Sequence, residues 1–145
     1  MDGAYTAEEL RKLHSAYAIV RKAFPGEDPE TLLQMLDICL KNEGLFVAPA
    51  SEMVMGVFRY NPRDVIGGRT LLQIVMDYDY DTLKLLDLRH GEVLHIVGFT
   101  SNKGDGFKIV RRFIKAFAPR AVSTHRFRNG KRFFCCRKHV GGWNA

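Results

Sequence analysis

The spacing of apolar residues in the first third of the chain predicts two amphipathic helices. The first is expected over residues 7–24, because Thr6-Ala7-Glu8-Glu9 has the form of a capping box and Pro25-Gly26 follows the last apolar position. The second is expected to start after Asp28, with Pro29 at its first position. Two sets of residues would form the buried faces: Leu10, Leu13, Tyr17, Val20 and Phe24, then Leu32, Leu33, Leu36, Cys39 and Leu40.

Shorter apolar segments follow, and most of them predict strands. Residues 45–48 and 53–60 are expected to be two strands joined by the turn-forming tetrad Pro49-Ala50-Ser51-Glu52. The apolar run at residues 71–76 is predicted as another strand. Residues 81–89 favour a short helix, because their leucines suit a helical spacing better than a strand alternation.

The dipeptide Asn129-Gly130 is the strongest hairpin signal in the chain. It separates two segments that are both predicted as strands, residues 121–128 and residues 131–138. A two-residue loop would also fix the register of this hairpin. The expected pairs are Arg128 with Lys131, Arg126 with Phe133, His125 with Phe134, and Thr124 with Cys135.

The chain is organised around residues 91–117, where a strand, a glycine loop and a helix are expected in succession. The strand is an apolar run rich in β-branched residues. The loop is Ser-Asn-Lys-Gly-Asp-Gly, and the helix has apolar residues at Phe107, Val110 and Ile114. Such an arrangement directs free main-chain N–H groups toward an anion, and Lys103 and Lys108 flank the loop. The alternative is an ordinary turn between a strand and a helix.

This stretch resembles the fourth strand, pyrophosphate loop and following helix of the GNAT superfamily of acyl-CoA-dependent N-acyltransferases. The loop of that family is usually Gln/Arg-x-x-Gly-x-Gly/Ala, and Ser101-Asn102-Lys103-Gly104-Asp105-Gly106 fits it except that Ser101 replaces Gln or Arg. The resemblance covers about residues 7–137. It departs at both ends, since there is no room for the first strand, and the final helix and last two strands are missing or reduced to the Asn129-Gly130 hairpin.

The resemblance implies an α/β (α+β-like) domain whose central, mostly antiparallel mixed sheet is flanked by helices. It also implies transfer of an acyl group, acetyl in the simplest case, from a CoA thioester to an amine acceptor, with acetyl-CoA or another acyl-CoA as the cofactor. The residues expected to bind the cofactor are Ile96, Val97, Gly98, Ser101, Lys103, Gly104, Asp105, Gly106, Phe107 and Lys108. The main chain of the first three would meet the developing oxyanion.

An acyl transfer to an amine also needs a base, and four residues are candidates for acid or base: His125, His95, Glu92 and Tyr80. His125 is the first choice, because it lies on the strand expected beside the central one. A hydrogen-bonded structural histidine is the alternative for His125. His95 alternates with Leu94 and Ile96, so it can equally pack in the core.

Charge is distributed unevenly along the chain. Residues 1–100 hold 10 Lys and Arg against 15 Asp and Glu, whereas residues 101–145 hold 12 against one, for a formal net charge of +6. A basic last third predicts an anionic partner, which can be nucleic acid, a phosphorylated cofactor or both. The residues expected to bind a polyanion are Arg111, Arg126, Arg128, Lys131 and Arg132. A solvated basic face is the alternative.

Two further hypotheses for function fit the same residues. One is a non-enzymatic nucleic-acid-binding module, in which the basic hairpin interleaves cations with Phe127, Phe133 and Phe134. The other is a degenerate transferase relative that serves as an assembly partner. A binding test with acetyl-CoA and with an oligonucleotide separates them.

The segment Asp77-Tyr78-Asp79-Tyr80-Asp81 places three carboxylates at alternate positions, which on a strand would share one face and suit Mg²⁺. An exposed acidic corner in which Asp81 caps the next helix is the preferred interpretation. We therefore expect no metal site.

Length and composition predict one domain over residues 1–145, with residues 139–145 as a flexible tail. No apolar run approaches the roughly 20 residues of a membrane helix, and the acidic, polar first residues do not resemble a signal peptide. The three cysteines show no framework spacing, which favours a reducing, cytoplasmic setting.

Overall fold

A computed structural model describes residues 5–100, 106–128 and 131–138. One five-stranded sheet has the strand order β1-β2-β5-β6-β7. These strands are β1 (Leu45–Ala48), β2 (Met53–Tyr60), β5 (Val93–Thr100), β6 (Ala121–Arg128) and β7 (Lys131–Lys138). Only β5 and β6 are parallel; the other neighbours are antiparallel. The predicted mixed, mostly antiparallel sheet is therefore confirmed.

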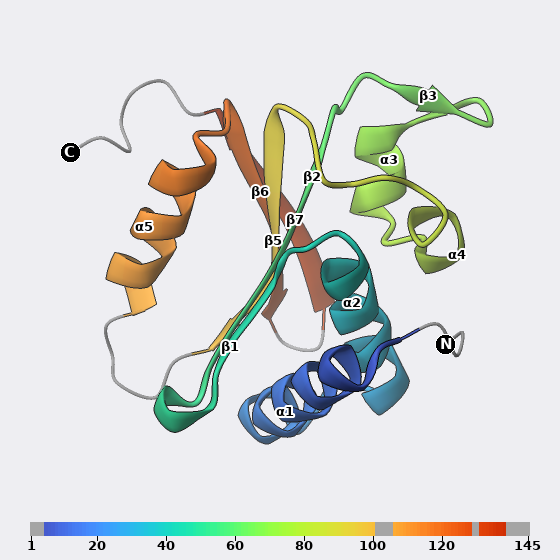
Figure 1. The fold of residues 1–145 in the computed structure, drawn as a ribbon. Helices are drawn as coiled ribbons and strands as arrows, with labels where there is room; N and C mark the ends of the chain where they lie inside the picture. The colour runs from blue at the N-terminus through green and yellow to red at the C-terminus, as the bar shows by residue number, and fades with distance from the viewer. Residues whose placement is uncertain (1–4, 101–105, 129–130, 139–145) are drawn as a thin grey trace.

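Helices cover both faces of the sheet (Figure 1). The elements α1 (Ala7–Ala23), α2 (Pro29–Lys41), α3 (Leu71–Met76) and α4 (Tyr80–Leu83) lie on one face, and α5 (Gly106–Phe117) lies on the other. A short 3-10 turn, η1 (Pro49–Ser51), joins β1 to β2. A separate two-stranded ribbon of β3 (Val65–Ile66) and β4 (Arg69–Thr70) precedes α3.

The local signals in the first third of the chain work as predicted. The Thr6 hydroxyl accepts from the main-chain N–H of Glu9 while the Glu9 carboxylate accepts from that of Thr6, which completes the capping box of α1. At the start of α2, Asp28 accepts from the main-chain N–H of Thr31, and Pro29 occupies the first helical position. Both predicted helices are confirmed.

The prediction of a strand at residues 71–76 is wrong, because this segment is the helix α3. Thr70 and Gln73 form a capping box, in which each side chain accepts from the other's main-chain N–H. The short helix expected at residues 81–89 is reduced to the four residues of α4. Its cap is Asp79, which accepts from the main-chain N–H of Thr82, and not Asp81 as expected.

The predicted hairpin around Asn129-Gly130 is confirmed in its register. Arg128 is opposite Lys131, and the remaining three expected pairs are all present. The two loop residues themselves and the predicted tail at residues 139–145 lie outside the described residues. Because register decides which side chains share a face, this pairing places His125 on the same side of the sheet as Phe134.

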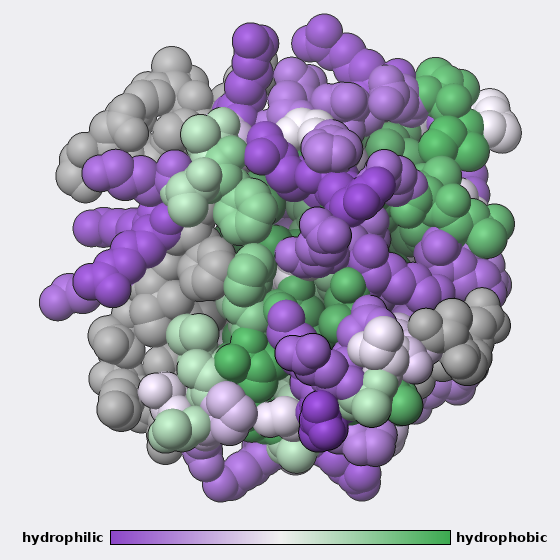
Figure 2. All heavy atoms as spheres, viewed as in Figure 1, coloured by the Kyte–Doolittle hydropathy of each residue, from purple (hydrophilic) through white to green (hydrophobic). Residues whose placement is uncertain are grey.

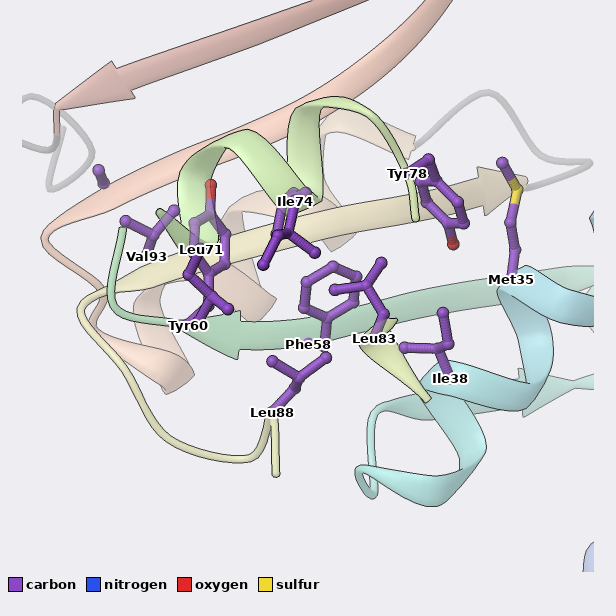
Figure 3. Close-up of a cluster of buried hydrophobic side chains, with 12 residues drawn as sticks. Met35, Ile38, Phe58, Tyr60, Leu71, Ile74, Tyr78, Leu83, Leu88 and Val93 are labelled. Carbon is purple, nitrogen blue, oxygen red and sulfur yellow. The ribbon is translucent and has the colours of Figure 1, made fainter. Parts of the chain in front are cut away.

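The core lies in layers on the two faces of the sheet. On the α5 face, Met55, Val57 and Leu94 pack against Ile114 of the helix. The opposite face holds the larger cluster, in which side chains of β2, α2, α3 and α4 converge; Figure 3 shows Phe58 and Tyr60 of β2 turned toward this cluster. The histidines described next belong to that opposite face.

Candidate functional site

The central strand β5 is interrupted by a bulge where it pairs with β2. Gly98 is opposite Gly56, but the next pair along is Ile96 with Val57, so Val97 is an extra residue on β5. A bulge takes a residue out of the ladder and bends the strand. Main-chain groups of the three predicted oxyanion-binding residues, Ile96, Val97 and Gly98, therefore occupy the least regular part of the sheet.

The parallel pairing of β5 with β6 ends at this bulge. Within the described residues, it runs from Val93 with Ala121 to Ile96 with Thr124, although β5 continues to Thr100 and β6 to Arg128. The Thr124 hydroxyl donates to the Ile96 carbonyl at 3.1 Å and so closes the last paired position. The next position in the same register would place Val97 beside His125. The pairing of the two strands thus ends where the bulge at Val97 and His125 would be opposite each other.

The two glycines at the bulge have different surroundings. A Cβ at Gly56 would lie 2.9 Å from Sγ of Cys39, which is buried in α2, and 3.8 Å from Cβ of Val97. A Cβ at Gly98 would meet no described heavy atom within 4 Å. The bulge is therefore packed tightly against Cys39 of α2 at Gly56 and is open at Gly98.

A chain of hydrogen bonds runs through the buried face beside the separation. The Tyr60 hydroxyl lies 2.9 Å from Oγ of Ser123, which lies 2.7 Å from Nδ1 of His95. Nε2 of His95 lies 3.2 Å from Nδ1 of His125, whose Nε2 lies 3.1 Å from the main-chain carbonyl oxygen of Met76. Tyr60, Ser123 and His95 are at most 1% exposed, and His125 is 9% exposed. The chain therefore approaches the surface at His125.

The hydrogens in this chain can be assigned from its last acceptor. The carbonyl of Met76 can only accept, so Nε2 of His125 carries a hydrogen. With His125 neutral, its Nδ1 accepts from Nε2–H of His95. Nδ1 of His95 then accepts from the Ser123 hydroxyl, which accepts from the Tyr60 hydroxyl. Every polar atom in the chain is thereby satisfied, which a buried network requires.

The surroundings of the network favour its uncharged form. Burial, with a smaller contribution from the charged form of His125, lowers the pKa of His95 well below 6.5. Burial also raises the pKa of Tyr60 above its ordinary value of 10. The His95 ring stacks on Phe134, with the ring centroids 6.1 Å apart, and Tyr78 meets His125 edge to face at 5.5 Å. Aromatic rings thus hold both imidazoles in place.

The structure brings together two of the four predicted acid or base residues, His95 and His125. Glu92 precedes β5, five residues from the bulge and so about 16 Å along the strand from it. Tyr80 lies elsewhere as well: its hydroxyl donates to Oδ2 of Asp37 at 2.7 Å, between α4 and α2. Neither Glu92 nor Tyr80 belongs to the hydrogen-bonded chain.

Sequence analysis missed Tyr60 and Ser123. The available signal for Ser123 was the hairpin register, which puts Ser123 and His125 on one face of β6. The contact with His95 required the parallel register of β5 and β6, in which His95 is opposite Ser123. No local pattern specifies that register.

The predicted cofactor loop can be followed only at its two ends. Residues 101–105 lie outside the described residues, and α5 begins at Gly106, six residues after β5 ends at Thr100. Lys108 is exposed in the first turn of α5. Side chains at Ser101, Lys103, Gly104, Asp105 and Phe107 are not described.

Exposed cations form a stripe along α5, and Figure 2 shows long hydrophilic side chains projecting on that side of the molecule. The stripe consists of Lys108, Arg111, Arg112 and Lys115. It lies opposite the apolar stripe that packs on the sheet. The other predicted polyanion contacts, Arg126, Arg128, Lys131 and Arg132, are on β6 and β7, and their side chains lie outside the description.

The acidic segment around Asp79 is held by an ion pair. Nη2 of Arg69 lies 2.6 Å from Oδ2 of Asp79, and hydrogen bonds from Arg69 and Thr82 lower the pKa of this carboxyl. Among the described residues, no group of three or more His, Cys, Asp or Glu is arranged to hold a metal ion. Nor does any helix in the described part of the chain have the length and apolarity needed to span a membrane.

No protein-family model matches this chain, and comparisons with curated proteins and with solved structures also find no significant match.

Proposed function

We propose that the protein is an acyl-CoA-dependent N-acyltransferase of compact GNAT-like architecture, which transfers an acyl group such as acetyl to an amine. The observation that carries this proposal is the separation of β5 from β6 at the Val97 bulge, with His125 level with it. A cofactor site, an oxyanion donor and a base would then share one place in the sheet.

The separated strands suit the shape of a CoA thioester. An extended, amide-containing chain can pair with strand edges that have lost their neighbour, as peptides do when they add to a sheet. The helix that follows β5 on the other face starts at Gly106, and a helix N-terminus attracts phosphate through its free N–H groups. The exposed Lys108 in its first turn has the matching charge.

His125 alone can carry out both proton transfers of the proposed reaction. The amine nitrogen attacks the thioester carbonyl carbon, and the new C–N bond forms as negative charge develops on the carbonyl oxygen. A main-chain N–H at the bulge would stabilise that charge. The C–S bond then breaks, and the amine proton passes to His125 and from there to the leaving thiolate. No separate acid is needed, which agrees with the remote position of Tyr80.

Binding and turnover test this proposal separately. Acetyl-CoA at about 100 times its Kd should raise the free energy of unfolding by about 2.7 kcal/mol. Release of the CoA thiol is then followed with a panel of small amines, lysine peptides and peptide N-termini. His125→Gln should retain binding and lose about a hundredfold or more in turnover, whereas His14→Gln, on the exposed side of α1, should change neither. If acyl-CoA neither stabilises the protein nor yields thiol with any amine, the proposal fails.

The exposed stripe on α5 favours a second candidate, a nucleic-acid-binding module. Four cations on one helix face suit phosphate contacts. If the module hypothesis holds, oligonucleotide affinity should fall steeply with salt, and Arg111→Glu should weaken binding while acetyl-CoA has no effect. Salt-independent or undetectable oligonucleotide binding would eliminate this candidate.

A further inference from the structure

The part of the hydrogen-bonded chain from Tyr60 to His125 can run in either direction. Each hydroxyl and each neutral imidazole in it both donates and accepts. In the arrangement derived above, hydrogens point from Tyr60 through Ser123 and His95 to His125, because the Met76 carbonyl holds a hydrogen on the outer nitrogen of His125. In that arrangement Nε2 of His125 is a donor and not a base.

A donor placed at Nε2 of His125 reverses this order. If an N–H group replaces the Met76 carbonyl there, Nε2 must accept, and the hydrogen of His125 moves to Nδ1. His95 then accepts at Nε2 and donates from Nδ1 to Ser123, which donates to Tyr60. The bonds among Tyr60, Ser123, His95 and His125 persist with their roles exchanged, and only the contact with the Met76 carbonyl is lost. Burial of both histidines makes the alternative, an unpaired nitrogen, costly.

We infer that Tyr60, Ser123 and His95 are positioning residues that form a proton relay, which keeps a hydrogen-bond partner at Nδ1 of His125 whichever of its two nitrogens carries the hydrogen. The inference rests on the proposed function in one respect, namely that the arriving donor is the acceptor amine. The relay itself depends only on the apoprotein. Ser123 does not serve as a nucleophile, because it is fully buried and its hydroxyl is shared by Tyr60 and His95.

The sheet register explains why the relay is rigid. His95 is opposite Phe58 on β2 and opposite Ser123 on β6, so two neighbouring strands fix its ring. The Phe58 and His95 ring centroids are 4.9 Å apart. His125 is fixed by its pairing with Phe134. A relay needs such fixed donor and acceptor positions, because a misaligned hydrogen bond weakens steeply.

The far end of the relay is buried at Tyr60. Cys136 is opposite Ser123 in the hairpin register and is exposed. Burial raises the pKa of Tyr60, and Cys136 contributes a smaller shift in the same direction. Among the described residues, the rings of Tyr60 on β2 and Tyr78 after α3 lie against the histidines, and Cys136 on β7 is opposite Ser123.

Nitrogen NMR of the imidazole rings tests the relay in the full-length apoprotein. We expect both His95 and His125 to carry hydrogen on Nε2 alone, with unprotonated Nδ1 signals; substitution of each histidine in turn assigns the signals. Ser123→Ala should leave the hydrogen of His95 on Nε2, because Nδ1 of His125 still accepts it, but should shift the signal of the unprotonated Nδ1 of His95, which loses its hydrogen bond. Ser123→Thr, which keeps the hydroxyl, should restore that signal. Tyr60→Phe removes only the last bond and should leave His95 unchanged. Hydrogen on Nδ1 of either ring in the wild type, or an unchanged Nδ1 signal of His95 in Ser123→Ala, overturns the inference.

The rate of acyl transfer separates this inference from the proposed function. Ser123→Ala should lower kcat about tenfold to a hundredfold, as does loss of an outer partner of a functional histidine, with KM for acetyl-CoA unchanged, and Ser123→Thr should recover most of kcat. If the tautomers behave as expected and no amine is acylated, the proposed function alone fails. If acylation occurs and Ser123→Ala keeps the full rate, the relay alone fails.

Discussion

Replacing Gly56 by alanine probes the packing that supports the bulge. The new Cβ would lie 2.9 Å from Sγ of Cys39, which is closer than van der Waals contact allows, and at an ordinary contact distance of 3.6 Å from the Cβ of Cys39. Cys39 is fully buried, so its sulfur has no exit to solvent. Forcing an extra methyl group into a filled core costs about 1–3 kcal/mol, and we expect Gly56→Ala to lower the free energy of unfolding by that amount.

The contact with Cys39 can be isolated by a double-mutant cycle. Cys39→Ala removes the sulfur and should cost about 1 kcal/mol by itself. In the double variant the new methyl group occupies the space the sulfur left, so the combined loss should be smaller than the sum by about 1 kcal/mol or more.

Urea unfolding followed by far-ultraviolet circular dichroism measures all three variants. Gly26→Ala is the matched control, since a Cβ at Gly26 meets nothing within 4 Å, and its effect should stay within about 0.5 kcal/mol. The reasoning is refuted if Gly56→Ala is as stable as the wild type, or if the effects of Gly56→Ala and Cys39→Ala simply add.

Three further predictions concern stability. His95 binds a proton below about pH 6.5 in the unfolded chain but not in the folded protein, where its pKa is lowered. The free energy of unfolding should therefore fall by at most about 1.4 kcal/mol per pH unit below pH 6.5. In a pH series of urea titrations, His95→Gln should lose that part of the slope. Asp79→Asn should lower the free energy of unfolding by about 1 kcal/mol at pH 7. The difference from the wild type should vanish as the pH falls through the lowered pKa of Asp79, because the carboxylate pairs with Arg69 only above that pKa. Thr70→Ala should cost about 1 kcal/mol in thermal unfolding by opening the capping box with Gln73; no loss would show that α3 forms without it.

The elements that were predicted correctly are specified by local sequence signals. The capping box at Thr6, the Asp28-Pro29 start and the Asn129-Gly130 turn each act over a few residues, and each has the expected structure beside it. The same kind of signal explains the error at residues 71–76. Thr70 and Gln73 have the spacing of a capping box, a local helix signal that the apolar run at residues 71–76 does not reveal by itself.

The candidate site was predictable only in part, because it depends on contacts between distant strands. His95 and His125 were each identified by position along the chain. Their contact with each other and with Ser123 follows from the parallel register of β5 and β6, which no hairpin turn determines. The bulge at Val97 is also set by the pairing with β2, and its one sequence correlate is the neighbouring Gly98.

The most direct test of the account is a calorimetric titration of acetyl-CoA into the wild type, Gly98→Val and the control Gly26→Val. The backbone of Gly98 lies outside the left-handed region, so valine can adopt it, and its side chain would extend into the open space at the bulge. We predict saturable binding to the wild type and to Gly26→Val, and at least about a tenfold weaker affinity for Gly98→Val, equivalent to 1.4 kcal/mol or more. Absence of binding to the wild type, or equal binding to all three proteins, would contradict a cofactor site between β5 and β6.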